Sequence, residues 1–235
     1  MSELYTESAL YGLLFRERSA DVAFYRAVVA RFGAPVLELG VGDGRVAFAL
    51  AADGHEVVGV DRSPHMLAAL ERQRGRRSVR VHEADARSFR IDQRFPTITC
   101  PFNGIAHCHT HQDQAAFLDT VKAHLGPGGV FVFDVMIPDP WQLAGGTSFV
   151  PRMEHPRTGA VCRMEETSTY DSKTEVLTLT TRLVDRMIGE TQELTLALRQ
   201  LYPQQTERML SFHGFEILER SAAIGDSLAY VCRVS

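Results

Sequence analysis

Five short apolar runs alternate with amphipathic stretches over roughly residues 34–137. The runs occupy 35–39, 55–60, 78–82, 95–100 and 130–133. Consecutive apolar positions are typical of strands that are covered on both faces. Helical spacing before the first run, at Val22, Tyr25 and Val29, and between later runs, as at Met66, Leu67 and Leu70, predicts helices that alternate with the strands. The alternation therefore predicts a parallel sheet in a doubly wound α/β fold.

Capping residues mark where these helices begin and end. Ser19 and the pair Ser63–Pro64 suit helix starts, because serine caps free backbone amides and proline fits the first turn. A helix with Leu118, Val121 and Leu125 on one face should end at the glycine-rich stretch 126–129.

The hydrophobic period changes from 3.6 to two between about residues 158 and 202. Leucines at every second position share one face, at 177, 179 and 183 and again at 194, 196 and 198. We expect antiparallel strands with one half-buried face, inserted at 139–202 into a single compact domain. A helix from about 204 and strands near 215–220 and 228–233 would complete the chain.

Charge and cysteine spacing limit the classes of function. The 235 residues carry a formal net charge of −4 without a long basic run, so a nucleic-acid partner is not expected. No CxxC pair, apolar leader or membrane-length apolar run is evident, which favours a reducing, cytoplasmic location and no membrane partner. A monomer and a homodimer both fit the sequence. The cysteines are Cys100, Cys108, Cys162 and Cys232.

A glycine-rich turn after the first apolar run carries the main functional signal. Gly40, Gly42 and Gly44 alternate between a predicted strand and a predicted helix. Glycines allow a ligand to approach the main chain closely, and the helix N-terminus offers free N–H groups to an anion. Arg45 stands where the dinucleotide fingerprint GxGxxG needs its third glycine, which disfavours NAD.

Acidic residues follow the next two strands at the same edge of the sheet. Asp61 can accept two hydrogen bonds from a ribose diol, and Asp85 can accept one from an exocyclic amine. Ligands of open α/β sheets bind at the carboxyl ends of the strands. The glycine turn and the two acids together predict a nucleoside-binding site.

Residues from about 11 to 138 resemble the class I methyltransferases that use S-adenosylmethionine (SAM), especially the small-molecule branch. The stretch 38–44 is similar to their acidic GxGxG motif, Asp61 to the acid that holds the SAM ribose, and Asp85–Ala86 to the pair that reads adenine. Residues 100–103 and 133–136 resemble the motifs of the fourth and fifth strands.

The resemblance implies a Rossmann-like seven-stranded sheet whose last strand is antiparallel. Residues 1–33, including Tyr5, would form a helical cap over the cofactor, and 139–202 would form a lid over the acceptor. The implied SAM contacts are Tyr11, Glu38, Gly40, Gly42, Gly44, Asp61, Arg62, Met66, Asp85, Ala86, Pro101 and Phe102.

Three alternating histidines follow the fourth strand. His107, His109 and His111 would place their imidazoles on one face of an extended segment, where they could hold a metal. We favour instead a loop without metal, in which His107 faces the substrate as general base or orienting group. Further candidate substrate contacts are Asn103, Trp141, Tyr202 and Arg199, which could pair with a substrate carboxylate or form a surface salt bridge.

The implied reaction is in-line transfer of a methyl group from SAM to a nitrogen, oxygen or sulfur of a small metabolite, leaving S-adenosylhomocysteine (SAH). Two alternatives remain open, an NAD-dependent oxidoreductase and a SAM-binding regulatory subunit without catalysis. The loop spacing argues against the first, and the long inserted segment argues against the second.

Overall fold

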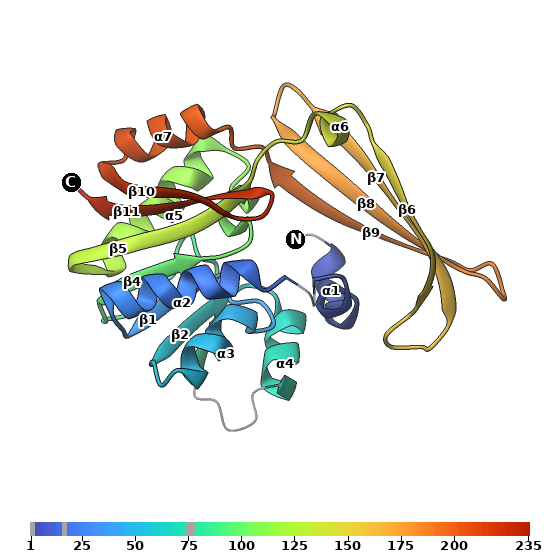
Figure 1. Cartoon of the computed structure of the whole chain (residues 1–235), viewed down its shortest axis with the longest axis horizontal. Helices are drawn as coiled ribbons and strands as arrows, with labels where there is room; N and C mark the ends of the chain where they lie inside the picture. Colours follow the sequence, from blue (N-terminus) through green and yellow to red (C-terminus); the bar gives the residue numbers. More distant parts are fainter. Residues whose placement is uncertain (1–2, 16–17, 74–78) are drawn as a thin grey trace.

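The computed structural model describes residues 3–15, 18–73 and 79–235, which form two sheets (Figure 1). Within these residues the larger sheet contains β1 (Val36–Leu39), β2 (Val57–Asp61), β3 (Val79–Glu83), β4 (Phe95–Cys100), β5 (Leu125–Met136), β10 (Phe215–Ile224) and β11 (Ser227–Val234). The smaller sheet contains β6 (Thr147–Glu154), β7 (Val161–Asp171), β8 (Val176–Asp185) and β9 (Thr191–Arg199).

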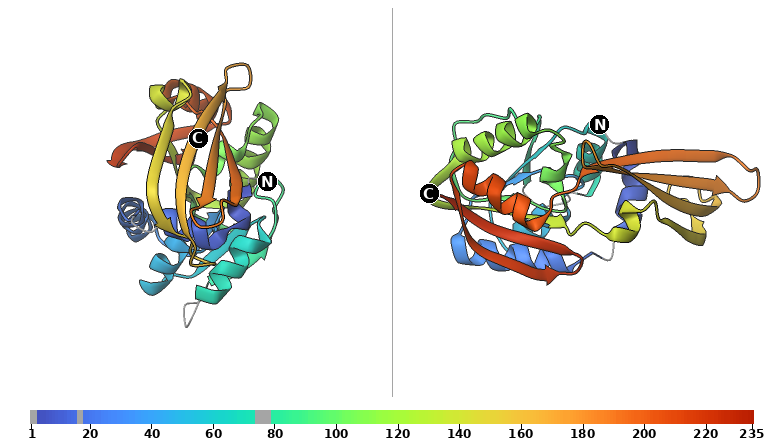
Figure 2. Two further views of the ribbon diagram at one scale, coloured as in Figure 1. Left: turned by 90° about the vertical axis from the view of Figure 1, so that its right-hand side faces the viewer. Right: turned by 90° about the horizontal axis from the view of Figure 1, so that it is seen from above.

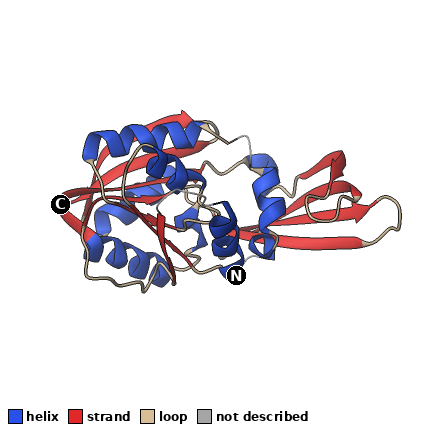
Figure 3. Cartoon of the chain, turned by 90° about the horizontal axis from the view of Figure 1, so that it is seen from below, coloured by secondary structure: helices blue, strands red, loops and turns tan. Residues whose placement is uncertain are grey.

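The helices of the described chain lie mostly around the larger sheet (Figure 3). The α-helices are α1 (Ser8–Leu14), α2 (Ala20–Phe32), α3 (Arg45–Ala52), α4 (Pro64–Gln73), α5 (His111–His124), α6 (Pro140–Leu143) and α7 (Pro203–Phe212). Two short 3-10 helices are η1 (Glu3–Thr6) and η2 (Gly104–His107). No helix among the described residues is long and apolar enough to cross a bilayer.

The strand order of the larger sheet is β10-β11-β5-β4-β1-β2-β3. β1 pairs in parallel with both β2 and β4, so the strand order reverses at β1 and a ligand crevice is expected at its carboxyl end. β11 is antiparallel to β5 and β10. The doubly wound, seven-stranded fold with an antiparallel last strand is thereby confirmed.

Helices cover both faces of this sheet. α2 and α3 bury Tyr25, Val29 and Leu50 against one face, and α5 and α7 bury Leu118 and Leu210 against the other. All four residues of β1 are buried, which explains why its sequence is continuously apolar apart from one acid. The covered faces leave the carboxyl edge of the strands for ligand binding.

The smaller sheet extends away from this body (Figure 2), and the buried residues of β8 share one face. On β8, Leu177, Leu179 and Leu183 are buried, as the period of two predicted. β6 was missed, because the alternation was expected to begin only at about residue 158. It is an edge strand with almost every residue exposed and contains Pro151, so it lacks the alternation that would reveal it.

The N-terminal segment that lies between the two sheets is shorter than the expected cap of residues 1–33. α2 packs on the larger sheet, whereas η1 and α1 lie between the sheets (Figure 1). There Leu4 and Leu10 form one buried cluster with Leu183 and Leu194 of the small sheet. Residues 3–14 are therefore the part of the N-terminal segment that lies between the two sheets.

The boundary between α5 and β5 also differs from expectation. The helix ends at His124, and Leu125 already belongs to β5 rather than to the helix. Gly128 has a φ of +71°, and the pairing of β4 with β5 shifts register between Phe95 and Thr97. The helix ends just before the glycine-rich stretch 126–129, as predicted. These four residues, however, form the irregular beginning of β5.

Candidate functional site

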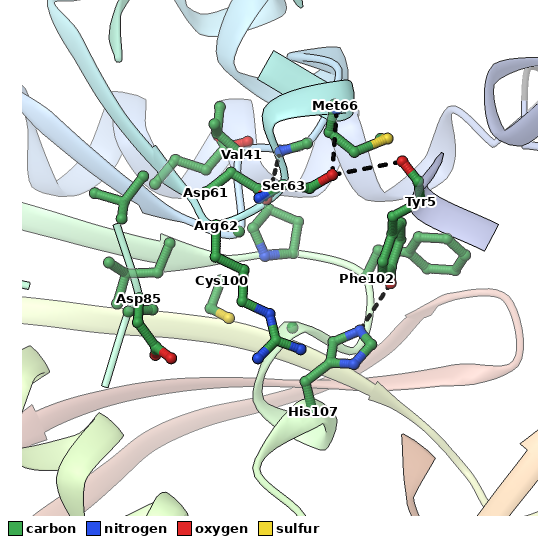
Figure 4. Close-up of a pocket in the computed structure, with 18 of the residues that line it drawn as sticks. Tyr5, Val41, Asp61, Arg62, Ser63, Met66, Asp85, Cys100, Phe102 and His107 are labelled. Atoms are coloured by element: carbon green, nitrogen blue, oxygen red, sulfur yellow. Dashed lines mark hydrogen bonds between the residues drawn. The ribbon is translucent and has the colours of Figure 1, made fainter. Parts of the chain in front are cut away.

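A pocket lies at the carboxyl ends of β1, β2, β3 and β4, against η1 and α1 (Figure 4). It brings together many of the predicted residues, namely Tyr11, Glu38, Gly40, Gly42, Asp61, Arg62, Met66, Asp85, Ala86, Pro101, Phe102 and His107. It is completed by residues that were not among the predicted cofactor or substrate contacts, including Asp43, Arg45, Ser63, Arg87, Cys100, Cys108 and Phe117.

The glycine turn forms one wall of this pocket. Its glycines all have positive φ, at +75° for Gly40, +56° for Gly42 and +89° for Gly44, a region open to glycine at little cost. Asp61 ties the turn to β2, because Oδ2 accepts from Gly42 N at 2.9 Å and Oδ1 from Ser63 N at 2.8 Å. Burial raises the pKa of Asp61, and these two amides oppose that rise.

Glu38 presents a buried carboxyl group to the pocket from β1. The residue is 2% exposed, and its Oε2 has no hydrogen-bond partner among the described residues. Burial raises the pKa of Glu38 to about 8, against the positive charge of Arg45. A buried acceptor without a partner is suited to an N–H group of a ligand.

Asp85 is held by a nearby arginine just after β3. Arg87 donates from Nε to Oδ1 at 2.9 Å and from Nη2 to Oδ2 at 2.6 Å. Its Nη1 pairs with Asp113 of α5. The side-chain hydrogen bond from Arg87 is the main reason that the pKa of Asp85 is lowered. Asp85 is therefore a charged acceptor of fixed orientation next to Ala86.

His107 reaches the pocket from η2 and meets Tyr5 of η1. Its Nε2 lies 2.7 Å from Tyr5 Oη, and the two rings meet edge to face with centroids 5.4 Å apart. Burial lowers the pKa of His107 to about 3, and the charge of Arg62 acts in the same direction. The imidazole is thus neutral near pH 7, and Nε2 can accept the Tyr5 proton.

The other two histidines of this segment face different partners. His109 Nε2 lies 3.1 Å from Ala197 O on β9, and His111 Nδ1 lies 3.2 Å from Gln114 Oε1. Instead of one extended run, the segment is η2 followed by the first turn of α5. No group of three metal-binding side chains occurs in the part of the chain that the structure describes.

The turn after β4 is held in an unusual conformation by β5. Phe102 and Asn103 have φ values of +51° and +62°, which are uncommon for residues other than glycine. Asp134 Oδ1 accepts from Phe102 N at 2.8 Å and from Tyr25 Oη at 2.7 Å. Asn103 Oδ1 accepts from Met136 N at 2.6 Å, so this predicted substrate residue is buried against the backbone and does not line the pocket.

The pocket lining also leaves out four further predicted residues, Gly44, Trp141, Arg199 and Tyr202. Trp141 is 52% exposed on α6, and Tyr202 lies just before α7. Arg199 is buried, with Nη1 donating to His109 O at 2.8 Å and Nη2 to Glu175 Oε2 at 2.6 Å. This guanidinium joins β9 to the histidine segment instead of facing the pocket.

Two arginines that line the pocket went unpredicted, Arg45 and Arg87. Arg45 donates from Nη1 and Nη2 to the two carboxylate oxygens of buried Asp21, at 2.7 and 2.6 Å. Each arginine has a partner on a helix distant in sequence, so local spacing does not reveal the pair. Their positions in the sequence could have identified them as site residues, because Arg45 directly follows the glycine turn and Arg87 directly follows Ala86.

Comparisons with known proteins find that this chain is similar to methyltransferases. Residues 36–129, from β1 into β5, match the family model described as a methyltransferase domain. The chain is 38% identical over 114 residues to a cypemycin N-terminal methyltransferase from a Streptomyces species, covering 48% of this chain and 46% of the relative. It is 31% identical over 170 residues to the dTDP-3-amino-3,6-dideoxy-alpha-D-glucopyranose N,N-dimethyltransferase of Streptomyces fradiae, covering 64% and 62%.

These alignments span about half and three fifths of the lengths of the two curated relatives. A solved structure extends the likeness further. The CcbJ methyltransferase from Streptomyces caelestis is 28% identical with a TM-score of 0.78, covering 93% of this chain and 90% of that chain. Because this superposition takes in nearly the whole chain, it includes the small sheet as well as the pocket.

Proposed function

We propose that the chain is a class I SAM-dependent methyltransferase and that it methylates a small-molecule metabolite. When bound, SAM would supply an electrophilic methyl group. The acceptor lone pair would form the new bond to that carbon while the carbon–sulfur bond breaks, and the electron pair of the broken bond would stay on the sulfur of SAH. The protein must hold the nucleophile in line, about 3–3.5 Å from the methyl carbon, and exclude water. The matches to methyltransferases argue against the oxidoreductase alternative.

In this proposal the cofactor occupies the glycine-turn end of the pocket. Asp61 would bind the ribose hydroxyls with the lone pairs that the two backbone amides leave free. Asp85 would accept from the adenine amine beside the backbone of Ala86, and Glu38 Oε2 from the ammonium of the methionine end. The surrounding contacts would come from Tyr11, Gly40, Gly42, Met66, Pro101 and Phe102.

One observation carries this assignment, namely that two backbone amides fix the Asp61 carboxylate at the rim of a pocket that also contains the unpartnered Glu38. Calorimetric titration of SAM and SAH tests it. We expect micromolar binding, weakened at least about tenfold by Asp61→Ala, or ~1.4 kcal/mol. Asp92→Ala, which removes an exposed acid outside the pocket, is the matched control. Binding of NAD but not of SAM would contradict the proposal.

We propose further that the reacting atom of the acceptor is a nitrogen held beside His107. One curated relative is named as an N,N-dimethyltransferase, and the other is named as a methyltransferase of an N-terminus. A pKa near 3 disfavours the imidazolium form, so His107 is better suited to orient Tyr5 Oη and the acceptor than to store a proton. Screening small amines by SAH release, with His107→Ala beside wild type, tests this role. Full turnover by the variant across pH would remove it.

The acceptor side of the pocket would be enclosed by the N-terminal segment and by the insertion at 139–202. Glu7 Oε1 accepts from Arg157 Nη2 at 2.9 Å and from Gln192 Nε2 at 3.0 Å, which fastens the segment to the small sheet. The contact of His109 with Ala197 fastens β9 to the histidine segment. A lid held at both points would exclude water from the reacting atoms.

The expected setting is the cytoplasm, with a small molecule and not a nucleic acid as partner. The cysteines at 100, 108, 162 and 232 are all unpaired and buried, as suits a reducing compartment. The net charge of −4 gives no general attraction to phosphate backbones.

A further inference from the structure

Among the described residues, Arg62 differs from the other basic residues of the pocket in its side-chain contacts. The other basic residues that line it, Arg45, Arg87 and His107, each hydrogen-bond to a carboxylate or a hydroxyl. Arg62 makes no hydrogen bond or ion pair through its side chain with any residue in the described ranges, and it is exposed. Its charge is therefore available to a ligand.

The Arg62 side chain extends toward His107 and away from the ribose end of the pocket. It leaves the chain directly after Asp61, yet its guanidinium reaches across the cavity to the histidine side (Figure 4). Its positive charge helps lower the pKa of His107 and opposes the rise in the pKa of Tyr5. The sequence grouped Arg62 with the cofactor contacts because of its position, but the side chain lies where the acceptor should enter.

Nearby carboxylates already have other donors. Both oxygens of Asp61 accept backbone amides, and both oxygens of Asp85 accept from Arg87. SAM would add a positive sulfonium near His107. Arg62 is a second positive charge at this end of the pocket, and an anionic group on the acceptor would compensate part of that charge.

We propose that Arg62 binds an oxyanion of the methyl acceptor, a carboxylate or a phosphate, and so holds the acceptor with its nucleophile beside His107. The proposal rests on the methyltransferase function argued above and narrows its substrate class. A guanidinium matches both oxyanions through two parallel N–H···O bonds, which strengthen when the ligand displaces water. Lysine would keep the charge but lose the paired geometry.

Acetate and inorganic phosphate serve as probes for the two oxyanions. Each is titrated by NMR into the SAH-loaded protein, in wild type, Arg62→Gln and Arg62→Lys. The control is Arg80→Gln, which removes a surface arginine whose Nη2 lies 3.0 Å from Glu56 Oε1. We expect wild type and the control to bind at least one probe, and Arg62→Gln to bind it at least about fivefold more weakly. The preferred probe identifies the oxyanion.

The SAH affinity of Arg62→Gln separates this proposal from the cofactor assignment. We expect it to stay within about twofold of wild type, since the acceptor and not the cofactor loses its contact. A tenfold loss of SAH affinity would assign Arg62 to the cofactor and overturn the inference. Equal probe binding by wild type and Arg62→Gln, or no probe binding by wild type, would also overturn it. Failure of wild type to bind SAH would instead overturn the proposed methyltransferase function.

Discussion

Tyr5 Oη lies 2.7 Å from His107 Nε2, although 102 positions separate the two residues in the chain. The backbone carbonyl of Tyr5 also accepts from Ser63 Oγ at 3.4 Å. Tyr5 therefore spans the pocket from the loop that follows Asp61 to the histidine segment. The position of η1 and the geometry of the pocket around His107 therefore depend on each other.

The buried imidazole of His107 should make stability fall in acid. Its pKa is about 3 in the folded chain and 6.5 in the unfolded chain, so the unfolded state binds a proton first as the pH drops. Between pH 7 and pH 5 this group alone removes about 2 kcal/mol from the free energy of unfolding. Urea unfolding of wild type and His107→Gln at both pH values measures the effect. The loss should be smaller in the variant, and equal losses would contradict the burial of a neutral imidazole.

Tyr11 should support cofactor binding through its ring. It lies 5.7 Å from the Tyr5 ring and 4.9 Å from the Phe15 ring, in the aromatic group that borders the pocket. Tyr11→Ala removes these contacts and should weaken SAH binding up to about tenfold, whereas Tyr11→Phe keeps the ring and most of the affinity. Phe149→Ala, at an exposed position of β6, is the control. An unchanged dissociation constant in Tyr11→Ala would remove Tyr11 from the site.

The sequence alone placed those site residues correctly whose position depends on a single strand or turn. Asp61 ends a strand that is buried on both faces, and the glycine turn directly follows another, so both could be placed at one edge of the sheet. The fold followed from the same runs. β6 was not predicted, because an exposed edge strand needs no alternation of apolar and polar residues.

Residues whose neighbours come from distant elements could not be placed in this way. Asn103 was expected to face the substrate, but β5 binds its side chain through Met136 N. We expected Arg199 to pair with a substrate carboxylate or to form a surface salt bridge. Instead its guanidinium is buried and donates to Glu175 and to the His109 carbonyl. A polar side chain looks the same in sequence whether its partner is a ligand or another strand.

Removing the Tyr25 hydroxyl should loosen the turn after β4. Tyr25 Oη donates to Asp134 Oδ1, the same oxygen that accepts from Phe102 N. Tyr25→Phe leaves that buried carboxyl group short of a donor, so we expect the free energy of unfolding to fall by about 1–3 kcal/mol. SAH affinity should fall as well, because Phe102 lines the pocket. Tyr202→Phe, at a partly exposed position, should change neither quantity, and a Tyr25→Phe protein as stable as wild type would show that Asp134 needs no such donor.

Gly44 and Gly54 offer a controlled comparison of backbone strain with crowding. Both have a φ of +89°, so alanine at either position should cost about 1–2 kcal/mol for the left-handed conformation. A Cβ at Gly44 would lie 2.8 Å from the Phe48 ring and 3.1 Å from Leu70 Cγ, whereas nothing lies within 4 Å of a Cβ at Gly54.

Gly44→Ala should therefore lose about 1–3 kcal/mol more than Gly54→Ala in denaturant unfolding, because the overpacked side chain must displace Phe48 or Leu70. Gly44 also precedes the first residue of α3, so its displacement should weaken SAH binding. Gly54 follows the far end of that helix, and its variant should bind SAH as wild type does. Equal stability losses in the two variants would mean that the side chains of Phe48 and Leu70 can move aside at no measurable cost. Equal SAH affinities would mean that the position of this turn does not control the cofactor site.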